Sequence, residues 1–322
     1  MKRPARIGGG SVRLRRCHAW WGAAGLALLV ACAPARAMEA GQSPYLKGYT
    51  DFGTGILPPP GVALRNDLYV YNGAERSQVP QGQATAHLKT VTDIVGLTVS
   101  TPLEVFGARY AFAVRGAWSD LSADQTLAPP RPRPTTSRDG RLDAFNDVVV
   151  SPLILGWQAG NLHWIFSVPV RLPVGAYDKN RVVNAGRNVY AAIPELSVTW
   201  LDPTSGWEVS GAALYAVSSN NPDTSYKSGD ILHVDFAVGR MLTPQFKLGV
   251  VGYYAQQLSD DSGTGAIYGP RRMRVLGIGP AASFSFALNG VPMTLVAKYY
   301  REFDAQNTTE GDAGLLSLRT RF

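Results

Sequence analysis

Charged side chains of both signs, together with two histidines, recur at alternate positions along this sequence. That spacing places them on one face of successive extended segments, because neighbouring strand residues point to opposite sides. Polar groups enclosed by a sheet either form ion pairs or line a path for solutes. The candidate pore-lining residues are Arg109, Arg115, His163, Arg171, Glu195, Glu208, His233, Asp235, Lys298 and Glu302, and Arg319 and Arg321 share this face.

Catalytic chemistry has little support in the sequence. A membrane phospholipase of this size needs a Ser–His pair that faces lipid, but we expect His87, His163 and His233 to face inward. The sequence has no Gly-x-Ser-x-Gly motif and no histidine pair with metal-binding spacing. We therefore expect neither an enzyme nor a bound cofactor.

Acidic residues in the long connections raise the question of calcium: Asp178, Asp223, Asp230, Asp260 and Asp261. The stretch 260–263 (DDSG) supplies the oxygen ligands that Ca²⁺ prefers. It lacks the regular Asp spacing and the closing Glu of a calcium loop, so solvated turn residues are the better interpretation. We predict no metal site.

The elements that must position these side chains have a repeat of two residues. In 162–172 (LHWIFSVPVRL), one alternate set is continuously apolar and the other is mixed. The same pattern predicts twelve strands, over 62–73, 84–100, 104–121, 145–158, 162–174, 188–201, 206–219, 230–242, 245–259, 272–288, 291–306 and 313–322.

The connections between these strands alternate in length. Short turns are expected at 101–103, 159–161, 202–205, 243–244 and 289–290, and longer loops at 74–83, 122–144, 175–187, 220–229, 260–271 and 307–312. Short turns at one rim and long loops at the other are typical of outer-membrane barrels. The fold class is therefore all-β: a single closed antiparallel transmembrane β-barrel of about twelve strands, in which the last strand pairs with the first because lipid tolerates no open edge.

The net charge of +7 belongs to the N-terminus. Residues 1–37 contain seven basic and no acidic residues, and the rest of the chain has 24 of each, which argues against a nucleic-acid partner. The basic start, the apolar run 19–30 and the sequence Ala35-Arg36-Ala37 predict a signal peptide cleaved before Met38. A lipidated Cys32 is the alternative; cleavage after Ala37 would leave a mature chain without cysteine.

The segment 38–61 precedes the first strand and is not strand-like. It contains three consecutive prolines at 58–60. We expect it either to enter the barrel at 62–322 as a partial plug or to hang at the periplasmic rim. Twelve strands lie between the filled eight-stranded barrel and the open sixteen-stranded porin, so a narrow or plugged passage is expected.

Several stretches of the chain resemble a bacterial outer-membrane family named for the meta pathway of phenol degradation, also called SphA-like. They are 147–164 (DVVVSPLILGWQAGNLHW), 169–194, 221–233, 252–265, 278–280 and 298–312. Residues 62–121 match more weakly. The resemblance implies an outer-membrane location in a Gram-negative bacterium and the uptake of small hydrophobic, often aromatic, growth substrates.

Two functions follow as hypotheses. The first is a barrel that passes small hydrophobic or aromatic molecules through a narrow lumen. The second is a structural or adhesive barrel whose inward charges form a closed ion-pair network. The expected partners are outer-membrane lipid, lipopolysaccharide, whose phosphates the stretch 129–134 (PPRPRP) could contact, and the barrel-assembly machinery.

Overall fold

The computed structural model describes residues 43–79, 82–130, 133–267 and 271–322. The predicted signal peptide and Cys32 lie outside these residues. Among them, no helix has the length and apolar character needed to cross a membrane. The strands are β1 (Gly61–Val79), β2 (Gly82–Val105), β3 (Ala108–Ala128), β4 (Thr136–Phe145), β5 (Val148–Ala159), β6 (Leu162–Ser167), β7 (Val170–Leu172), β8 (Ala191–Ala192), β9 (Glu195–Leu201), β10 (Trp207–Ser218), β11 (Ile231–Met241), β12 (Phe246–Gln257), β13 (Arg274–Leu288), β14 (Val291–Gln306) and β15 (Glu310–Arg321).

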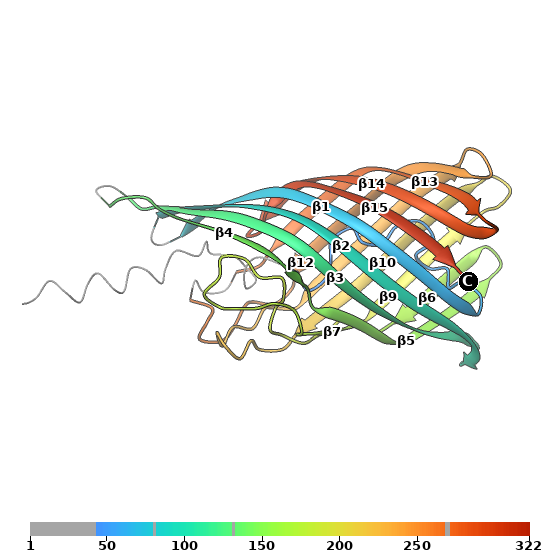
Figure 1. The fold of residues 1–322 in the computed structure, drawn as a ribbon, viewed down its shortest axis with the longest axis horizontal. Helices are drawn as coiled ribbons and strands as arrows, with labels where there is room; N and C mark the ends of the chain where they lie inside the picture. Colours follow the sequence, from blue (N-terminus) through green and yellow to red (C-terminus); the bar gives the residue numbers. More distant parts are fainter. Residues whose placement is uncertain (1–42, 80–81, 131–132, 268–270) are drawn as a thin grey trace, which may run out of the picture.

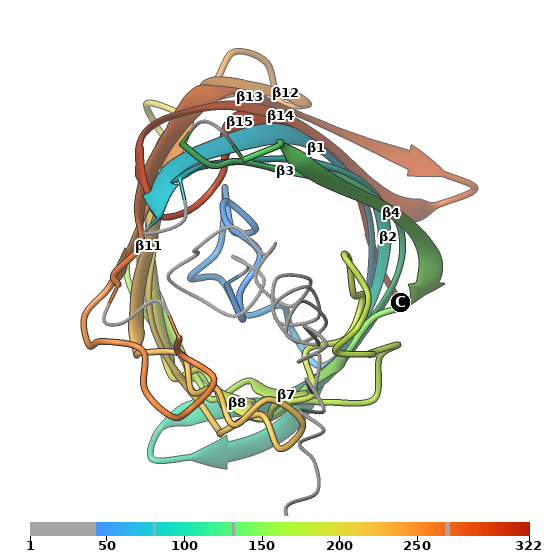
Figure 2. The ribbon, with the colours of Figure 1, turned by 90° about the vertical axis from the view of Figure 1, so that its left-hand side faces the viewer.

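These strands close into one antiparallel barrel (Figures 1 and 2). β1 pairs with β2 on one side and with β15 on the other, which confirms the predicted closure. At the seam, the Phe322 amide donates to the Val62 carbonyl at 2.8 Å, and the Val62 amide donates to the Phe322 carbonyl at 3.1 Å. The wall counts as twelve strands because β4 and β5, β6 and β7, and β8 and β9 are each one interrupted strand.

Prolines account for two of the interruptions. Pro169 and Pro194 have no N–H to donate to the ladder, so β6 ends before one and β9 begins after the other. The wall stays hydrogen-bonded across both breaks. The Ile193 amide donates to the Pro169 carbonyl at 2.9 Å, and the Tyr215 amide donates to the Pro194 carbonyl at 3.0 Å.

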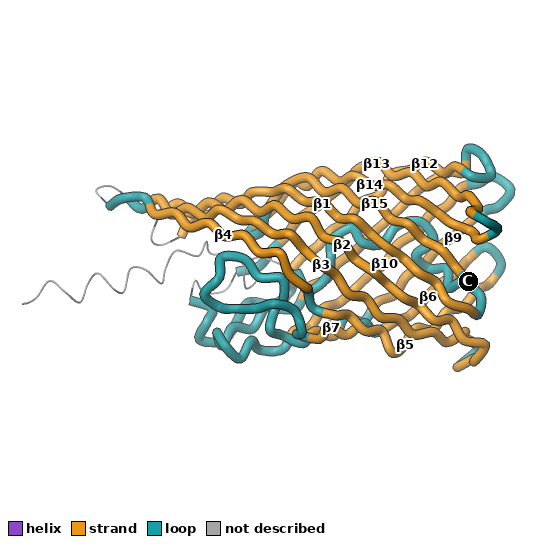
Figure 3. Tube along the Cα trace, in the orientation of Figure 1, coloured by secondary structure: helices purple, strands orange, loops and turns teal. Residues whose placement is uncertain are grey.

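Alternation along β1 separates a lipid face from a luminal face. Leu68 and Val70 point outward and are 44% and 45% exposed, whereas Asp67 and Tyr69 are buried inside. An apolar outer band and a polar interior are what a bilayer requires of a barrel. The larger loops gather at the end of the barrel away from Phe322 (Figure 3), and this end faces the outside of the cell.

The predicted loops 74–83 and 122–144 were wrong over most of their length. β1 and β2 continue to Val79 and from Gly82, and β3 and β4 continue to Ala128 and from Thr136. Beyond the lipid the outward face becomes polar, as at Arg76, so the apolar alternation stops while the strands still pair. Each extension therefore lacks the apolar alternation that predicts a membrane-spanning strand.

Two other boundaries also differ from the prediction. The turn expected at 101–103 lies at Phe106 and Gly107, both with positive φ, because a register shift between Ser100 and Glu104 accommodates Pro102 within β2. The strand expected over 188–201 begins only at Ala191 and is interrupted. The Asn289–Gly290 turn lies where it was predicted.

Candidate functional site

Residues 43–60 lie inside the barrel, as the view along its axis shows (Figure 2). We call them the luminal segment. The segment starts near the long-loop end, where the Ser43 carbonyl accepts from Arg187 Nη2 at 3.2 Å. It ends at the opposite rim, where β1 begins. It has no regular secondary structure of its own, so its position depends on contacts with the wall.

Asp51 of the luminal segment binds two basic wall residues. Arg319 Nη2 lies 2.7 and 2.6 Å from the two carboxylate oxygens, and Lys298 Nζ lies 2.8 Å from Oδ2. Lys298 also donates to the carbonyls of residues 48, 49 and 50 at 2.7, 2.9 and 3.2 Å. Burial raises the pKa of Asp51, but the cations of Arg319 and Lys298 outweigh it and hold the pKa well below the usual range. The buried carboxylate is therefore ionised.

Asp235 of β11 holds the preceding turn of the luminal segment. It accepts from Thr50 Oγ1 at 2.6 Å, the Thr50 amide at 3.1 Å, the Gly48 amide at 3.2 Å and the Tyr45 hydroxyl at 3.3 Å. His233 Nε2 lies 2.7 Å from the same carboxylate, and its ring centroid is 4.8 Å from that of Tyr45. Burial and the Asp235 carboxylate raise the pKa of Tyr45, which keeps its hydroxyl a donor.

Glu208 of β10 holds the segment nearer the periplasm. It accepts from the Gly53 amide at 2.6 Å and pairs with Lys247 of β12. The Phe52 ring lies over the backbone of Gly239, where a Cβ would come within 2.5 Å of it. A missing side chain in the wall therefore makes room for an aromatic ring of the segment.

Gly55 lies directly against the backbone of the wall. Its amide donates to Thr199 Oγ1 at 2.9 Å, and a Cβ at this position would overlap the Thr199 backbone. Just beyond, the Pro58 carbonyl accepts from Arg109 Nη1 at 3.1 Å.

Glu302 of β14 is buried beside the outer half of the segment. It accepts from the hydroxyls of Tyr71 and Tyr253 at 2.7 and 2.6 Å, and it pairs with Lys47. Three strands (β1, β12 and β14), separated from one another by β15 and β13, and the luminal segment therefore share one carboxylate.

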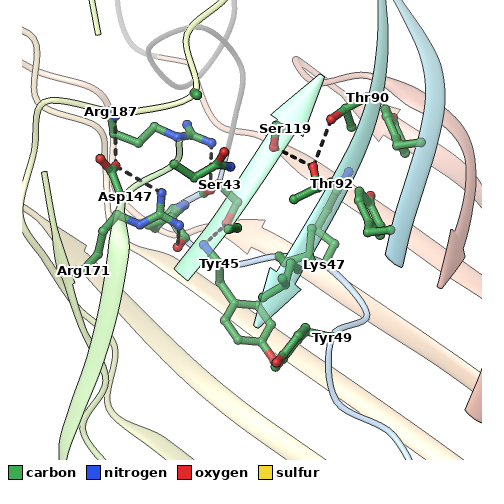
Figure 4. Close-up of a pocket in the computed structure, with 18 of the residues that line it drawn as sticks. Ser43, Tyr45, Lys47, Tyr49, Thr90, Thr92, Ser119, Asp147, Arg171 and Arg187 are labelled. Atoms are coloured by element: carbon green, nitrogen blue, oxygen red, sulfur yellow. Dashed lines mark hydrogen bonds and ion pairs between the residues drawn. The ribbon is translucent and has the colours of Figure 1, made fainter. Parts of the chain in front are cut away.

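Asp147 anchors the outer end, at the interruption between β4 and β5 (Figure 4). It accepts from the amides of Gly175 and Arg187 at 3.0 and 2.9 Å and lies 3.6 Å from Arg171 Nη1. Arg171 in turn donates to the Pro44 carbonyl. The carboxylate thus joins the loop after β7 to the wall and orients the arginine that holds the segment.

The structure brings most of the predicted residues to the luminal segment rather than to one another. Direct contacts come from Arg109, Arg115, Arg171, Glu208, His233, Asp235, Lys298, Glu302 and Arg319. Glu195 accepts from Ser197 Oγ at 2.7 Å. Glu195 and the exposed Arg321 both line a cavity between the wall and the periplasmic half of the luminal segment. His163 approaches the segment through its carbonyl. His87 is exposed on the outside of β2, so its predicted inward orientation was wrong; in this stretch small and polar residues occupy both faces.

Several residues of this site were not among the candidates. Arg65 and Lys247 lie on predicted strands, so the alternation that identified the others could have identified them. Lys47, Tyr49 and Asp51 lie in a segment without periodicity, and no signal in the sequence links them to wall residues about 250 positions later.

Two cavities flank the luminal segment. The outer one has a volume of about 220 Å³. Apolar and hydroxyl side chains of β1, β2 and β3, such as Tyr69, Leu88 and Thr92, form one side of it, and the luminal segment and charged residues such as Asp147 and Arg171 form the rest. The inner one, of about 490 Å³, opens toward the short-turn rim. Tyr45, Tyr49 and Arg115 line both, so these side chains separate the cavities.

Asp261, one of the acidic loop residues, holds neighbouring parts of the loops together. Asp261 accepts from Tyr226 Oη at 2.6 Å, Gln257 Nε2 at 2.7 Å and the Gly229 amide at 3.0 Å. Burial raises the pKa of Asp261 despite these donors. In the described ranges, no three histidine, cysteine or acidic side chains are grouped so as to hold a metal ion.

Residues 71–319 match the family described as "Putative MetA-pathway of phenol degradation". The chain belongs to this family. The match spans the barrel from the middle of β1 to the end of β15 and agrees with the resemblance found in the loops and strand ends. None of the curated proteins matches the chain.

One solved outer-membrane channel shares the fold of this chain, and other barrels are more distantly similar. The COG4313 outer membrane channel from Pseudomonas putida F1 superposes with a TM-score of 0.65 at 13% identity, over 85% of this chain and 100% of that one. The β domain of the Bordetella autotransporter BrkA gives 0.49 at 10% identity, over 81% and 100%, and a Pseudomonas aeruginosa FadL homologue gives 0.40 at 11%, over 82% and 90%. The protein is an outer-membrane β-barrel.

Proposed function

We propose that this barrel passes small hydrophobic or aromatic molecules across the outer membrane by a narrow path between its wall and the docked luminal segment. The observation that carries this function is the pair of cavities on either side of the segment, which share Tyr45, Tyr49 and Arg115 as their boundary. The neighbour from Pseudomonas putida is itself called a channel, which supports the same class of function.

The luminal segment is part of the path in this proposal. Wall residues Lys298, Asp235 and Glu208 bind it between residues 48 and 53. Arg171 and Arg109 hold its two ends, so it narrows the lumen along most of its length. A barrel of twelve strands without such a segment would leave an aqueous opening larger than an eight-stranded one. We infer that the docked segment blocks hydrated inorganic ions and leaves room only for compact organic solutes.

The proposal also covers export of the chain, its insertion into the membrane and its contact with lipopolysaccharide. Residues 1–37 would be removed on export, and the barrel-assembly machinery would insert the mature chain. The exposed β3–β4 hairpin lies outside the lipid and would meet lipopolysaccharide; residues 131–132 of its tip lie outside the described residues. We propose that the protein is not an enzyme.

Uptake by cells tests the function. Deleting the gene should slow the uptake of aromatic growth substrates at low external concentration, and the wild-type gene should restore it. Unchanged uptake across a broad panel of aromatic compounds would contradict the proposal.

A second candidate is a structural barrel with a permanently closed lumen. The number of wall residues engaged with the luminal segment favours it, because each contact stabilises the closed arrangement. It predicts that the purified protein in liposomes admits no solute, whereas the channel admits small aromatic molecules.

A further inference from the structure

Two arginines form a pair across three neighbouring strands. The register places Arg65 of β1 opposite Gly96 of β2, and Gly96 opposite Arg115 of β3. Directly opposed residues point to the same face of a sheet, so both arginines face the lumen with a glycine between them. A Cβ at Gly96 would lie only 3.2 Å from Arg115 Cγ. The missing side chain at Gly96 leaves room for the stem of Arg115, and we call the place where the guanidinium groups of Arg65 and Arg115 both meet the luminal segment the slot.

The ring of Tyr49 occupies this slot. Its centroid lies 4.1 Å from Arg65 Cζ and 4.7 Å from Arg115 Cζ. Both distances fall within the roughly 6 Å at which a cation is attracted to an aromatic face. The Tyr45 ring meets Tyr49 edge-on, with centroids 6.4 Å apart.

The arginine pair and the Tyr49 ring are held by different parts of the structure. Arg65 Nε lies 2.8 Å from both oxygens of Asp67, which fixes its guanidinium from the wall side. The Tyr49 carbonyl accepts from Lys298 at 2.9 Å and from Arg65 Nη2 at 3.1 Å. The backbone of Tyr49 is thus anchored, and its ring can leave the slot by rotation of the side chain without release of the segment.

The slot lies where the two cavities meet. Tyr49 and Arg115 line both, and the outer cavity of about 220 Å³ adds Ile94 and Leu121 as apolar wall. An apolar cavity of roughly 150 Å³ accepts a benzene molecule. A single substituted ring therefore has room in the outer cavity beside Arg115, and Arg65 is reached from the inner cavity.

We propose that Arg65 and Arg115 form a binding site for an aromatic ring in the permeation path, occupied at rest by Tyr49. A permeant ring displaces the Tyr49 ring and moves past it from the outer to the inner cavity. The inference rests on the proposed function and adds the chemistry of the permeant: one aromatic ring, with an anionic substituent favoured by the two guanidinium groups. A saturated ring of equal size and charge lacks the π face and therefore gains less binding affinity from the two guanidinium groups.

Equilibrium binding of benzoate to the purified full-length mature barrel tests the site. Tyr49→Leu removes the resident ring and should tighten benzoate binding by roughly fivefold to tenfold, as expected for loss of a competing cation–π contact. Tyr49→Phe keeps the ring but loses the hydroxyl that hydrogen-bonds to Arg115, so its gain in benzoate affinity should be much smaller than that of Tyr49→Leu. Cyclohexanecarboxylate, with the same charge and carbon count, should gain much less from Tyr49→Leu. Equal gains for both acids, or none for either, would overturn the proposal.

Arg115→Gln supplies the second arm, measured as entry into liposomes. The wild type should admit benzoate faster than cyclohexanecarboxylate, and the ratio should fall to about one in Arg115→Gln, since loss of charge slows both acids alike. Arg76→Gln, on the exposed outer face of β1, is the matched control and should keep the ratio. An unchanged ratio in Arg115→Gln would contradict the inference. If neither acid enters with any variant, the proposed channel fails, while the binding arm still decides the site.

Discussion

Replacing Asp51 by asparagine should release the luminal segment from the wall. The substitution keeps the size of the side chain but removes the charge that faces Lys298 and Arg319. Lys298 is completely buried and has Asp51 as its carboxylate partner, so the variant leaves an uncompensated ammonium inside the barrel. The docked state loses stability, whereas the undocked state, in which water reaches both groups, does not.

The size of the effect follows from the contacts that remain. Removing one member of a buried ion pair typically costs about 3–5 kcal/mol. Lys298 keeps its three carbonyl acceptors, and Arg319 is partly exposed, so the cost should fall at or just below the lower end of this range. We expect a loss of about 2–3 kcal/mol in docking free energy, which shifts the equilibrium toward the undocked segment by roughly 30- to 150-fold.

Single-channel recording in a planar bilayer measures this shift. The wild type should show low ion conductance with rare openings, and Asp51→Asn should open far more often to a larger conductance. Asp312→Asn is the matched control, because its carboxylate forms an exposed ion pair on the outside of the barrel. Heat-modifiable gel migration should show that all three barrels are folded. Equal open probability in Asp51→Asn and wild type would refute the role assigned to this ion pair.

Three further predictions concern the segment and the wall. Gly55→Ala should raise ion conductance, because the added Cβ overlaps the wall; Gly314→Ala, where nothing lies within 4 Å, should not. Leu68→Arg places a charge on the lipid face and should destabilise the barrel by about 2–4 kcal/mol in a refolding titration, whereas Gln78→Arg on the outward face beyond the lipid should cost little. The pKa of Asp51 is lower in the docked state, so docking is fully stabilised above about pH 4 and weakens as the pH falls further; openings of the wild type should increase only in that acidic range, and less so in Asp51→Asn. An onset near neutral pH would contradict this assignment.

The sequence predicts the barrel well because a bilayer constrains it so strongly. A lipid face requires apolar side chains at every second residue, and this pattern gave the twelve strands, their closure and the inward orientation of residues such as Lys298 and Asp235. The extensions of β3 and β4 lie outside the lipid, where backbone pairing continues without an apolar face. Nothing in the local pattern marks them.

The partners of the inward residues could not be predicted in the same way. Alternation tells which side of the sheet Asp235 faces, but not that Thr50, 185 positions earlier, donates to it. The luminal segment has no periodicity, and its fit depends on missing side chains such as that of Gly239 beneath Phe52. Such contacts arise from the assembled barrel and are not encoded in any one stretch of the chain.

A reversible cross-link tests the central claim most directly. Thr54 Oγ1 lies 3.4 Å from Ser197 Oγ of β9, so cysteines at these two positions can form a disulfide that fastens the luminal segment to the wall. Both natural cysteines lie within residues 1–37. The measurement is the ion conductance of the Asp51→Asn protein that carries both cysteines, before and after reduction. The account predicts low conductance when the disulfide is formed and high conductance once it is reduced. The same conductance in both states would contradict the claim that the docked segment closes the lumen to ions.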